Sequence, residues 1–287
     1  AQFDLQAGDV PGRDRIIGSL DAQRLDLGPW AGSAIPPAVL TVRADVRAEI
    51  ENLSQLRQAA VDLRFEEGSR WNRQPLSGAV KAQVDVAAAA PGGTAAPDPE
   101  LDPLAGLRIH GLDMDLRLGR NRVRATGELE AAGGAVTLDA QAPQLDAFWP
   151  DLPGGADVRA RLDGSVASHR GEITASYTPP NPRPGVIGQA RAQANLTFAG
   201  GWGRGPAGQP DAALAGWRGS FSRLSADTAG FAVSADRPVT LSFLPSAVAP
   251  QWQWQVGQTA FSLTLPGKER LTVAHQGSRG GGKRWET

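Results

Sequence analysis

The sequence contains no cysteine, and its positive and negative charges nearly cancel. Without cysteine, the 287-residue chain cannot form disulfides, thiolate zinc sites, iron–sulfur clusters or a cysteine nucleophile. The 29 Lys and Arg residues against 30 Asp and Glu leave a formal charge of −1. This balance argues against nucleic-acid binding, because affinity for a phosphate backbone comes largely from basic side chains.

Aromatic residues and long hydrophobic runs are also scarce. Aromatic residues make up 6% of the chain, and Ala, Gly, Leu and Val supply most of its apolar side chains. There is no run of 18 apolar residues and no signal-peptide pattern. The first residues already alternate like a strand. We therefore expect residues 1–287 to be one continuous β segment of a longer protein, with any membrane anchor outside it.

The sequence does contain a strict alternation of apolar and polar residues. Between Leu40 and Glu51 every even position is apolar and every odd position is polar, as in a strand with one apolar face. The pattern recurs in about sixteen segments separated by turn signals, which favours antiparallel meander pairing. The predicted fold class is all-β, a long antiparallel meander, with helical signals only near 53–60 and 144–149.

The alternation changes phase near Gly111. Leu107 and Ile109 lie at odd positions, whereas Leu112 and Met114 lie at even ones. A one-residue slip would turn the apolar set to the other face of the sheet. The sequence therefore predicts a β-bulge at Gly111 that absorbs the extra residue.

Three segments rich in Gly and Pro interrupt the strand pattern, at 87–103, 178–188 and 200–211. Such compositions do not sustain a ladder of backbone hydrogen bonds, and we expect flexible insertions there. The same strand pattern resumes on both sides of each segment. The insertions are therefore not expected to separate domains.

No catalytic or metal-binding pattern stands out. His110, His169 and His275 lie on separate predicted elements, without a partner at metal-ligand spacing. The carboxylates are spread over alternate strand positions, and no nucleophile motif is present. We therefore expect no metal, no cofactor and no enzymatic activity. The eight Trp residues lie mostly at turns or strand ends, which favours edge packing over a rim that contacts lipid or carbohydrate.

A sheet with one apolar face can hide that face in three ways. It can fold into a two-sheet sandwich, close into a barrel, or curl lengthwise into a groove that holds a ligand. The small residues at many inward positions favour a lumen, because a tightly packed sandwich usually contains more Phe, Trp and Ile.

Two phrases of the sequence carry a resemblance to a known family. Residues 119–129 (GRNRVRATGEL) continue into 136–150 (VTLDAQAPQLDAFWP) and a strand that ends in 162–165 (LDGS). Residues 71–78 (WNRQPLSG) form the second phrase. Their order resembles the recurring unit of the TamB family, within the AsmA-like group of bridge-like lipid-transfer proteins. The clearest similarity covers residues 104–166.

The resemblance implies a β-taco, an open antiparallel sheet curled around an apolar groove, in the periplasm of a Gram-negative bacterium. Family members are anchored to the inner membrane by an N-terminal helix, which would lie outside this segment. They belong to the translocation and assembly module, and are linked to phospholipid movement between the membranes and to outer-membrane protein assembly. The implied partners are phospholipid acyl chains and an Omp85-type outer-membrane barrel, the latter contacted outside this segment.

Alternation alone predicts which side chains would line such a groove. Two other functions stay open: a scaffold that binds nascent outer-membrane β-barrel proteins by β-augmentation without transporting lipid, and a plain β-sandwich binding module. The predicted groove-lining residues are Leu40, Val42, Val46, Ile50, Leu112, Met114, Leu116, Leu118, Val123, Leu138, Val158 and Leu162.

Overall fold

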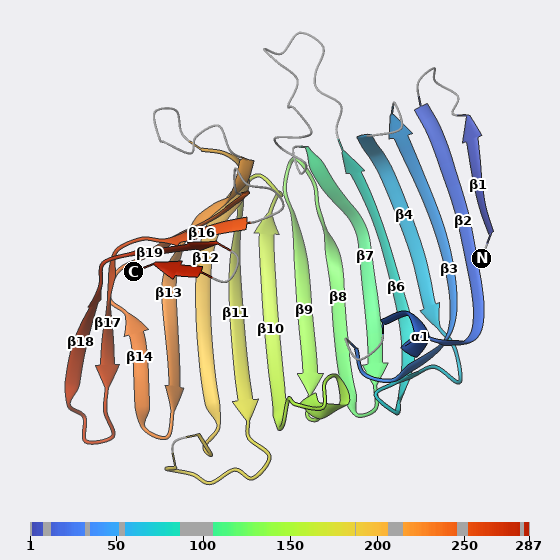
Figure 1. The fold of residues 1–287 in the computed structure, drawn as a ribbon. Helices are drawn as coiled ribbons and strands as arrows, with labels where there is room; N and C mark the ends of the chain where they lie inside the picture. Colours follow the sequence, from blue (N-terminus) through green and yellow to red (C-terminus); the bar gives the residue numbers. More distant parts are fainter. Residues whose placement is uncertain are drawn as a thin grey trace.

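The computed structural model describes residues 2–7, 13–31, 35–51, 55–86, 106–186, 188–205, 215–245, 252–281 and 284–286. The alternating segments of the sequence form strands, and these residues make one 20-stranded sheet (Figure 1). One helical turn, α1 (Gly28–Ala31), and one 3-10 turn, η2 (Leu145–Ala147), lie beside it. The all-β class predicted from alternation is confirmed.

The first half of the sheet contains the longest uninterrupted alternation. Its strands are β1 (Gln2–Ala7), β2 (Arg13–Asp26), β3 (Ala38–Glu51), β4 (Gln55–Phe65), β5 (Arg70–Trp71), β6 (Gln74–Val86), β7 (Leu107–Leu118), β8 (Asn121–Leu129), β9 (Gly134–Ala142) and β10 (Gly155–Gly164).

The second half begins with three long strands and ends with short ones. Its strands are β11 (His169–Thr178), β12 (Ala192–Arg204), β13 (Ala215–Thr228), β14 (Phe231–Ala235), β15 (Val239–Pro245), β16 (Trp252–Val256), β17 (Thr259–Thr264), β18 (Arg270–His275), β19 (Ser278–Gly281) and β20 (Arg284–Glu286).

Neighbouring strands pair antiparallel in chain order from β1 to β13, with the short β5 between β3 and β6. Tight turns make this meander possible. Asn72 and Arg73 have φ of 47° and 64°, and Ala229 and Gly230 have φ of 51° and 82°. Positive φ at both central residues matches the right-handed twist of the strands that the turn joins. The predicted antiparallel meander is therefore confirmed for strands β1 to β13.

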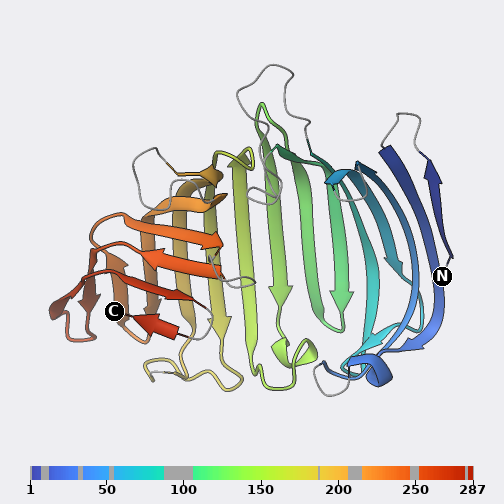
Figure 2. The same cartoon turned by 45° about the horizontal axis from the view of Figure 1, so that its top comes forward.

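The sheet forks at β13. Residues 217–221 of β13 pair with β15, and residues 225–228 pair with β14. The β14 branch continues through β17 to β18, and the β15 branch through β16 and β19 to β20. The strands of the β15 branch run across the direction of their neighbours (Figure 2). Nothing in the alternation predicts this fork, because the sequence pattern is the same in both branches.

Gly111 forms the predicted bulge. The register of β7 shifts against β8 between Ile109 and Leu112, and Gly111 has a φ of 56°. Glycine adopts this left-handed conformation without the steric cost that a side chain would add. The bulge returns Leu112 to the face that carries Ile109, and the prediction is confirmed.

Some local predictions are wrong. The helix expected near 53–60 is a strand from Gln55 onward, because β4 pairs with both β3 and β6, and such tertiary pairing overrides a local helical pattern. The turn expected within 144–149 is present as η2. The short helix α1 was not predicted.

The predicted breaks have mixed outcomes. The segment 87–103 lies outside the described residues. Within the second break, the described residues between β11 and β12 form no strand. The third break begins later than predicted, because residues 200–204 continue β12 and pair with 215–219 of β13. Glycine allows a neighbouring aromatic ring to cover the backbone there, as shown below.

The sheet forms a single layer of strands over most of its width (Figures 1 and 2). The chain exposes 17,964 Å², whereas a compact folded protein of 30.0 kDa exposes about 11,700 Å². Among the described residues, no second layer of strands lies over the part of the sheet before the fork, whereas beyond it the β15 branch crosses its neighbours (Figure 2) and its Val239 and Leu244 are buried. This arrangement differs from the two-sheet sandwich that the sequence left open.

Candidate functional site

The pairing register places apolar side chains from many strands in continuous rows on one face of the sheet. Residues directly opposite each other on neighbouring strands point to the same face. Row A crosses fourteen strands, from β2 to β14 and on to β17 and β18, with β5 outside it. Its members are Ala22, Val42, Phe65, Gly78, Leu116, Val123, Ala140, Val158, Ala175, Ala194, Ala226, Val233, Leu263 and Leu271.

Two further rows run beside row A on the same face. Row B crosses eleven strands and ends on β13; it consists of Leu20, Ala44, Leu63, Val80, Met114, Ala125, Leu138, Ala160, Ile173, Leu196 and Leu224. Row C runs from β7 into the β15 branch; it consists of Leu112, Gly127, Val136, Leu162, Gly171, Phe198, Phe221 and Val239.

Rows A and B contain no polar side chain. Neighbouring strands lie about 4.8 Å apart, so row A extends for about 60 Å across the sheet. It runs perpendicular to the strands, and its members are distant from one another in sequence. A strip of this kind provides apolar contact along its whole length and no hydrogen-bonding side chain.

The structure brings the twelve predicted groove-lining residues together on this face. Eight of them belong to the rows: Val42, Leu116, Val123, Val158, Met114, Leu138, Leu112 and Leu162. The other four extend the same face along their strands. Leu40 pairs with Leu25, Val46 with Val61, Ile50 with Leu56, and Leu118 with Leu76.

Most of these side chains are not covered. Val42 and Leu118 are each 5% exposed, and the remaining ten are half-buried. A core between two stacked sheets would bury them almost completely. The exposed fraction reaches 50% at Leu271, at the end of row A, and 54% at Val273 beside it on β18. The apolar face therefore remains accessible to a ligand.

An aromatic cluster of Phe198, Trp217 and Phe221 lies on the same face where the sheet forks. The centroid of the Phe198 ring lies 6.2 Å from the centroid of the Trp217 ring and 6.0 Å from that of the Phe221 ring. A Cβ atom at Gly171 would lie 2.5 Å from the Phe198 ring, and one at Gly219 would lie 2.6 Å from the Trp217 ring. The rings therefore occupy space above glycine positions that a side chain there would fill.

Sequence reasoning did not identify this cluster as a unit. The available signal was glycine at strand positions that belong to the apolar set, namely 171, 200 and 219. Glycine inside a strand often marks the close approach of another group. At Gly200 that group is the Trp217 ring, 2.7 Å from the position of a Cβ atom. Glycine at residue 200 was the basis for predicting a loop, but its lack of a side chain instead leaves room for the Trp217 ring.

His169 joins the aromatic cluster through hydrogen bonds at both ring nitrogens. Trp217 Nε1 donates to His169 Nε2 at 2.9 Å, and His169 Nδ1 lies 3.0 Å from the Ser165 carbonyl oxygen. Because the indole nitrogen can only donate, Nε2 accepts and Nδ1 carries the hydrogen. His169 is therefore a half-buried structural residue.

The two phrases that carry the family resemblance contact each other at one end of the sheet. Trp71 Nε1 donates to the Phe148 carbonyl oxygen at 2.8 Å, and Asn72 Nδ2 donates to the Asp146 carbonyl oxygen at 2.6 Å. The rings of Trp71 and Trp149 lie 6.1 Å apart. These contacts hold the η2 turn against the β5–β6 hairpin, in agreement with edge packing of Trp71 and Trp149.

A buried asparagine strengthens this end of the sheet. Asn121 is 1% exposed; its Nδ2 donates to the Gln144 carbonyl oxygen at 2.7 Å, and its Oδ1 accepts from the Gln144 backbone nitrogen at 2.9 Å. Removal of the amide would leave buried backbone groups without partners, at a cost of about 1–3 kcal/mol. The asparagine in the first phrase therefore has a structural role.

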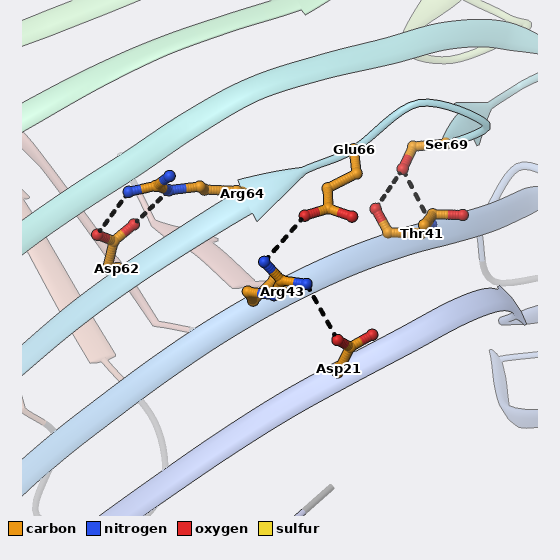
Figure 3. A network of polar contacts seen from close by, with 7 residues as sticks. All are labelled: Asp21, Thr41, Arg43, Asp62, Arg64, Glu66 and Ser69. Carbon is orange, nitrogen blue, oxygen red and sulfur yellow. Dashed lines mark hydrogen bonds and ion pairs between the residues drawn. The ribbon is translucent and has the colours of Figure 1, made fainter.

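The opposite face of the sheet carries the charged side chains. Arg43 lies between Asp21 and Glu66, at 3.3 and 3.7 Å, and Arg64 Nε lies 3.2 Å from Asp62 (Figure 3). These side chains are largely exposed, so each pair contributes little to stability. These ion pairs keep this face hydrated, so that one face of the sheet is charged and the other, which carries the rows, is apolar.

Acid should weaken the sheet through the ion pairs of the charged face. A hydrogen bond from Arg122, assisted by Arg124, lowers the pKa of Asp115 from 3.8 to about 2. A lowered folded-state pKa contributes stability that is complete above the unfolded value and is lost as pH falls through the folded value. We therefore expect the urea midpoint to decrease between pH 4 and pH 2, by a small amount because Asp115 is 41% exposed.

The variant Asp115→Asn should reduce this acid dependence. Asp113, two residues away on the same strand, forms no ion pair within the described parts of the chain, so Asp113→Asn is the matched control. An equal loss of acid dependence in both variants would contradict the assignment to the Asp115–Arg122 pair.

The charged face contains surface depressions between its long side chains. One of about 560 Å³ is bordered by Arg15, Arg47 and Gln58, and Ala60 forms part of its lining. The depression forms because long charged side chains surround the short side chain of Ala60, and it is open to solvent. It lacks the convergent, enclosed polar groups of a small-molecule site, and the apolar rows remain the better candidate.

The three histidines have different polar partners. His110 Nε2 lies 2.8 Å from Asp85 Oδ2, and His110 Nδ1 contacts Glu130. Asp85 lies on β6 and Glu130 directly follows β8, so sequence spacing could not indicate these partners. His275 Nε2 lies 3.2 Å from the Ser278 hydroxyl. Among the described residues no group of three or more potential ligands could hold a metal ion.

The described part of the chain contains no helix with the length and apolar character needed to cross a membrane.

No protein-family model, curated protein or solved structure matches the chain. The case for a function therefore depends on the apolar rows and on the residues around them.

Proposed function

We propose that the apolar face binds phospholipid acyl chains, and that the sheet is a segment of an open groove that conducts them along rows A, B and C. The observation that carries the proposal is row A: fourteen strands contribute a residue, none of them is polar, and most remain accessible. We infer that the sheet curls around these rows while its charged face remains in water.

The chemistry of the rows favours hydrocarbon over polypeptide as the occupant. A polypeptide lying on this face would bury backbone N–H and C=O groups without partners, which costs free energy for every unpaired group. Hydrocarbon has no such groups. The length of row A, about 60 Å, is also about four times the ~15 Å hydrocarbon depth of one membrane leaflet. The rows therefore suit several acyl chains in succession.

The energetic benefit is large for each lipid. Each methylene group moved from water to an apolar surface is stabilised by about 0.8 kcal/mol, or roughly 12 kcal/mol for ~15 methylenes. A continuous apolar strip keeps this contribution nearly constant along the path. Lipid could then move between positions without a large barrier, and the chain would need no catalytic group of its own.

We further propose that the chain is a periplasmic segment of a TamB-like envelope protein, anchored to the inner membrane through a region outside residues 1–287. The two phrases at residues 71–78 and 119–165 support this proposal, because their contacts hold together the same end of the sheet. Support of outer-membrane protein assembly with an Omp85-type barrel partner belongs to the same proposal.

A second candidate function is a scaffold for nascent β-barrel proteins by strand addition. The observation that favours it is the edge strand β18, which pairs only with β17 within the described residues and carries the exposed side chains Leu271 and Val273. An extended peptide can add to such an edge. In that case unfolded barrel protein would bind at β18, and phospholipid would not label the rows.

Site-specific photo-crosslinking tests the proposal. A photoreactive residue at Val46 or Leu116 in the purified chain, incubated with vesicles of phosphatidylethanolamine and phosphatidylglycerol, should yield phospholipid adducts by mass spectrometry. Arg43 and Arg117 are the matched controls, because they lie on the same strands and on the charged face. Absence of adducts at Val46 and Leu116, or equal labelling at Arg43 and Arg117, would refute lipid binding by the apolar rows.

A further inference from the structure

The fork at β13 separates two different kinds of apolar surface. Row A enters the β14 branch through Ala194, Ala226 and Val233, which are small or aliphatic. Row C enters the β15 branch through Phe198 and Phe221, which are aromatic. The path of a bound acyl chain therefore has two possible continuations after β12.

A β-bulge separates the two continuations. The register between β12 and β13 shifts between Thr197 and Phe198, so that Ser222 is the extra residue on β13. Bulges increase local twist and redirect the strand. On one side of the bulge β13 pairs with β14, and on the other side it pairs with β15.

The aromatic cluster lies across the entrance to the β15 branch and is held rigidly. Trp217 contacts Phe198 and Phe221 with ring centroids 6.2 Å from each, and its ring covers Gly200 and Gly219. The hydrogen bond from Trp217 Nε1 to His169 Nε2 fixes the indole from a third strand, β11. A ring packed against backbone and hydrogen-bonded at its edge cannot turn aside without losing both contacts.

We propose that the cluster of Phe198, Trp217, Phe221 and His169 is a wall that confines hydrocarbon to row A and directs it into the β14 branch. This inference rests on the proposed lipid function and specifies the route that the acyl chains take. It excludes the β15 branch from the lipid path. The exposed fractions of 37% at Val233 and 50% at Leu271 leave the favoured branch accessible up to strand β18.

Photo-crosslinking at three positions of the full chain tests the route with vesicles of phosphatidylethanolamine and phosphatidylglycerol. Leu138 precedes the fork, Val233 lies in the β14 branch, and Leu241 lies in the β15 branch on the same face. We expect phospholipid adducts at Leu138 and Val233, severalfold stronger than at Leu241. Labelling at Leu241 equal to that at Val233 would contradict the proposed role of the cluster as a wall. Labelling at Leu138 with none at Val233 would contradict it as well.

Labelling at the three positions distinguishes failure of the proposed wall from failure of the proposed lipid binding. No labelling at Leu138 would refute lipid binding itself, whereas labelling at Leu138 with the wrong branch refutes only the wall. The comparison uses the unaltered cluster, so it remains decisive where a substitution in the cluster impairs folding.

Removal of the indole provides the direct test of the wall. Trp217→Ala should raise labelling at Leu241 severalfold, because it opens the space above Gly200 and Gly219. Trp217→Phe retains a ring and should keep labelling low. Trp149→Ala, which removes a tryptophan from the connection between β9 and β10, is the matched control. Unchanged labelling at Leu241 in a folded Trp217→Ala protein, checked by circular dichroism, would contradict the proposal.

Discussion

Leu138→Asp should abolish phospholipid transfer and leave the sheet folded. Leu138 lies in row B between Ala125 and Ala160, half-buried on the accessible apolar face. A carboxylate there remains partly hydrated, so we expect a loss of about 1–3 kcal/mol in the free energy of unfolding. The same charge would interrupt the hydrocarbon path, because an acyl chain in contact with it would have to displace its water.

Transfer of a fluorescent phospholipid between donor and acceptor vesicles measures the effect. We expect at least a tenfold lower rate, which corresponds to about 1.4 kcal/mol or more. Thr137→Asp is the matched control, because Thr137 is the neighbouring residue and lies exposed on the charged face. Equal inhibition by both variants would argue against a path along the apolar rows. Unfolding of the Leu138→Asp protein would indicate instead that this face is a closed core.

Gly78→Ala should cause a large loss of stability. Gly78 has a φ of 124°, and a Cβ atom there would lie 2.0 Å from the Asp115 carbonyl oxygen and 3.0 Å from the Leu116 Cα. These are backbone atoms of the neighbouring strand β7, which cannot move without breaking the β6–β7 ladder. Backbone strain and steric overlap together should cost about 3–5 kcal/mol.

Gly111→Ala is the control for the backbone conformation alone. Gly111 also has a positive φ, of 56°, but no atom lies within 4 Å of the position of a Cβ. We expect a cost of about 1–2 kcal/mol, from the left-handed conformation. Urea unfolding followed by circular dichroism compares the two variants. Equal free energies of unfolding would show that the close approach of β7 to Gly78 does not contribute to the loss of stability.

The faces of the strands were predictable from the sequence because the side-chain period of a strand is two. Val42, Leu116 and Leu138 share a face for this reason, and the bulge at Gly111 follows from the change in phase around it. A local rule that involves only neighbouring residues is sufficient for such inferences.

Features that depend on partners distant in sequence could not be predicted. The segment near residues 53–60 forms a strand because β3 and β6 pair with it, although its local pattern was helical. Gly200 belongs to a strand because the Trp217 ring covers it, although glycine-rich sequence usually predicts a loop. Both errors arise because tertiary contacts are stronger than local preference.

By itself the sequence determined that the chain forms antiparallel strands with one apolar and one charged face, because alternation with period two specifies both. Only the tertiary structure decided which strands pair and in what register. Register is a property of two segments, so it alone could align residues from fourteen strands into row A. The fork at β13 and the cluster around Trp217 depend on the same long-range contacts.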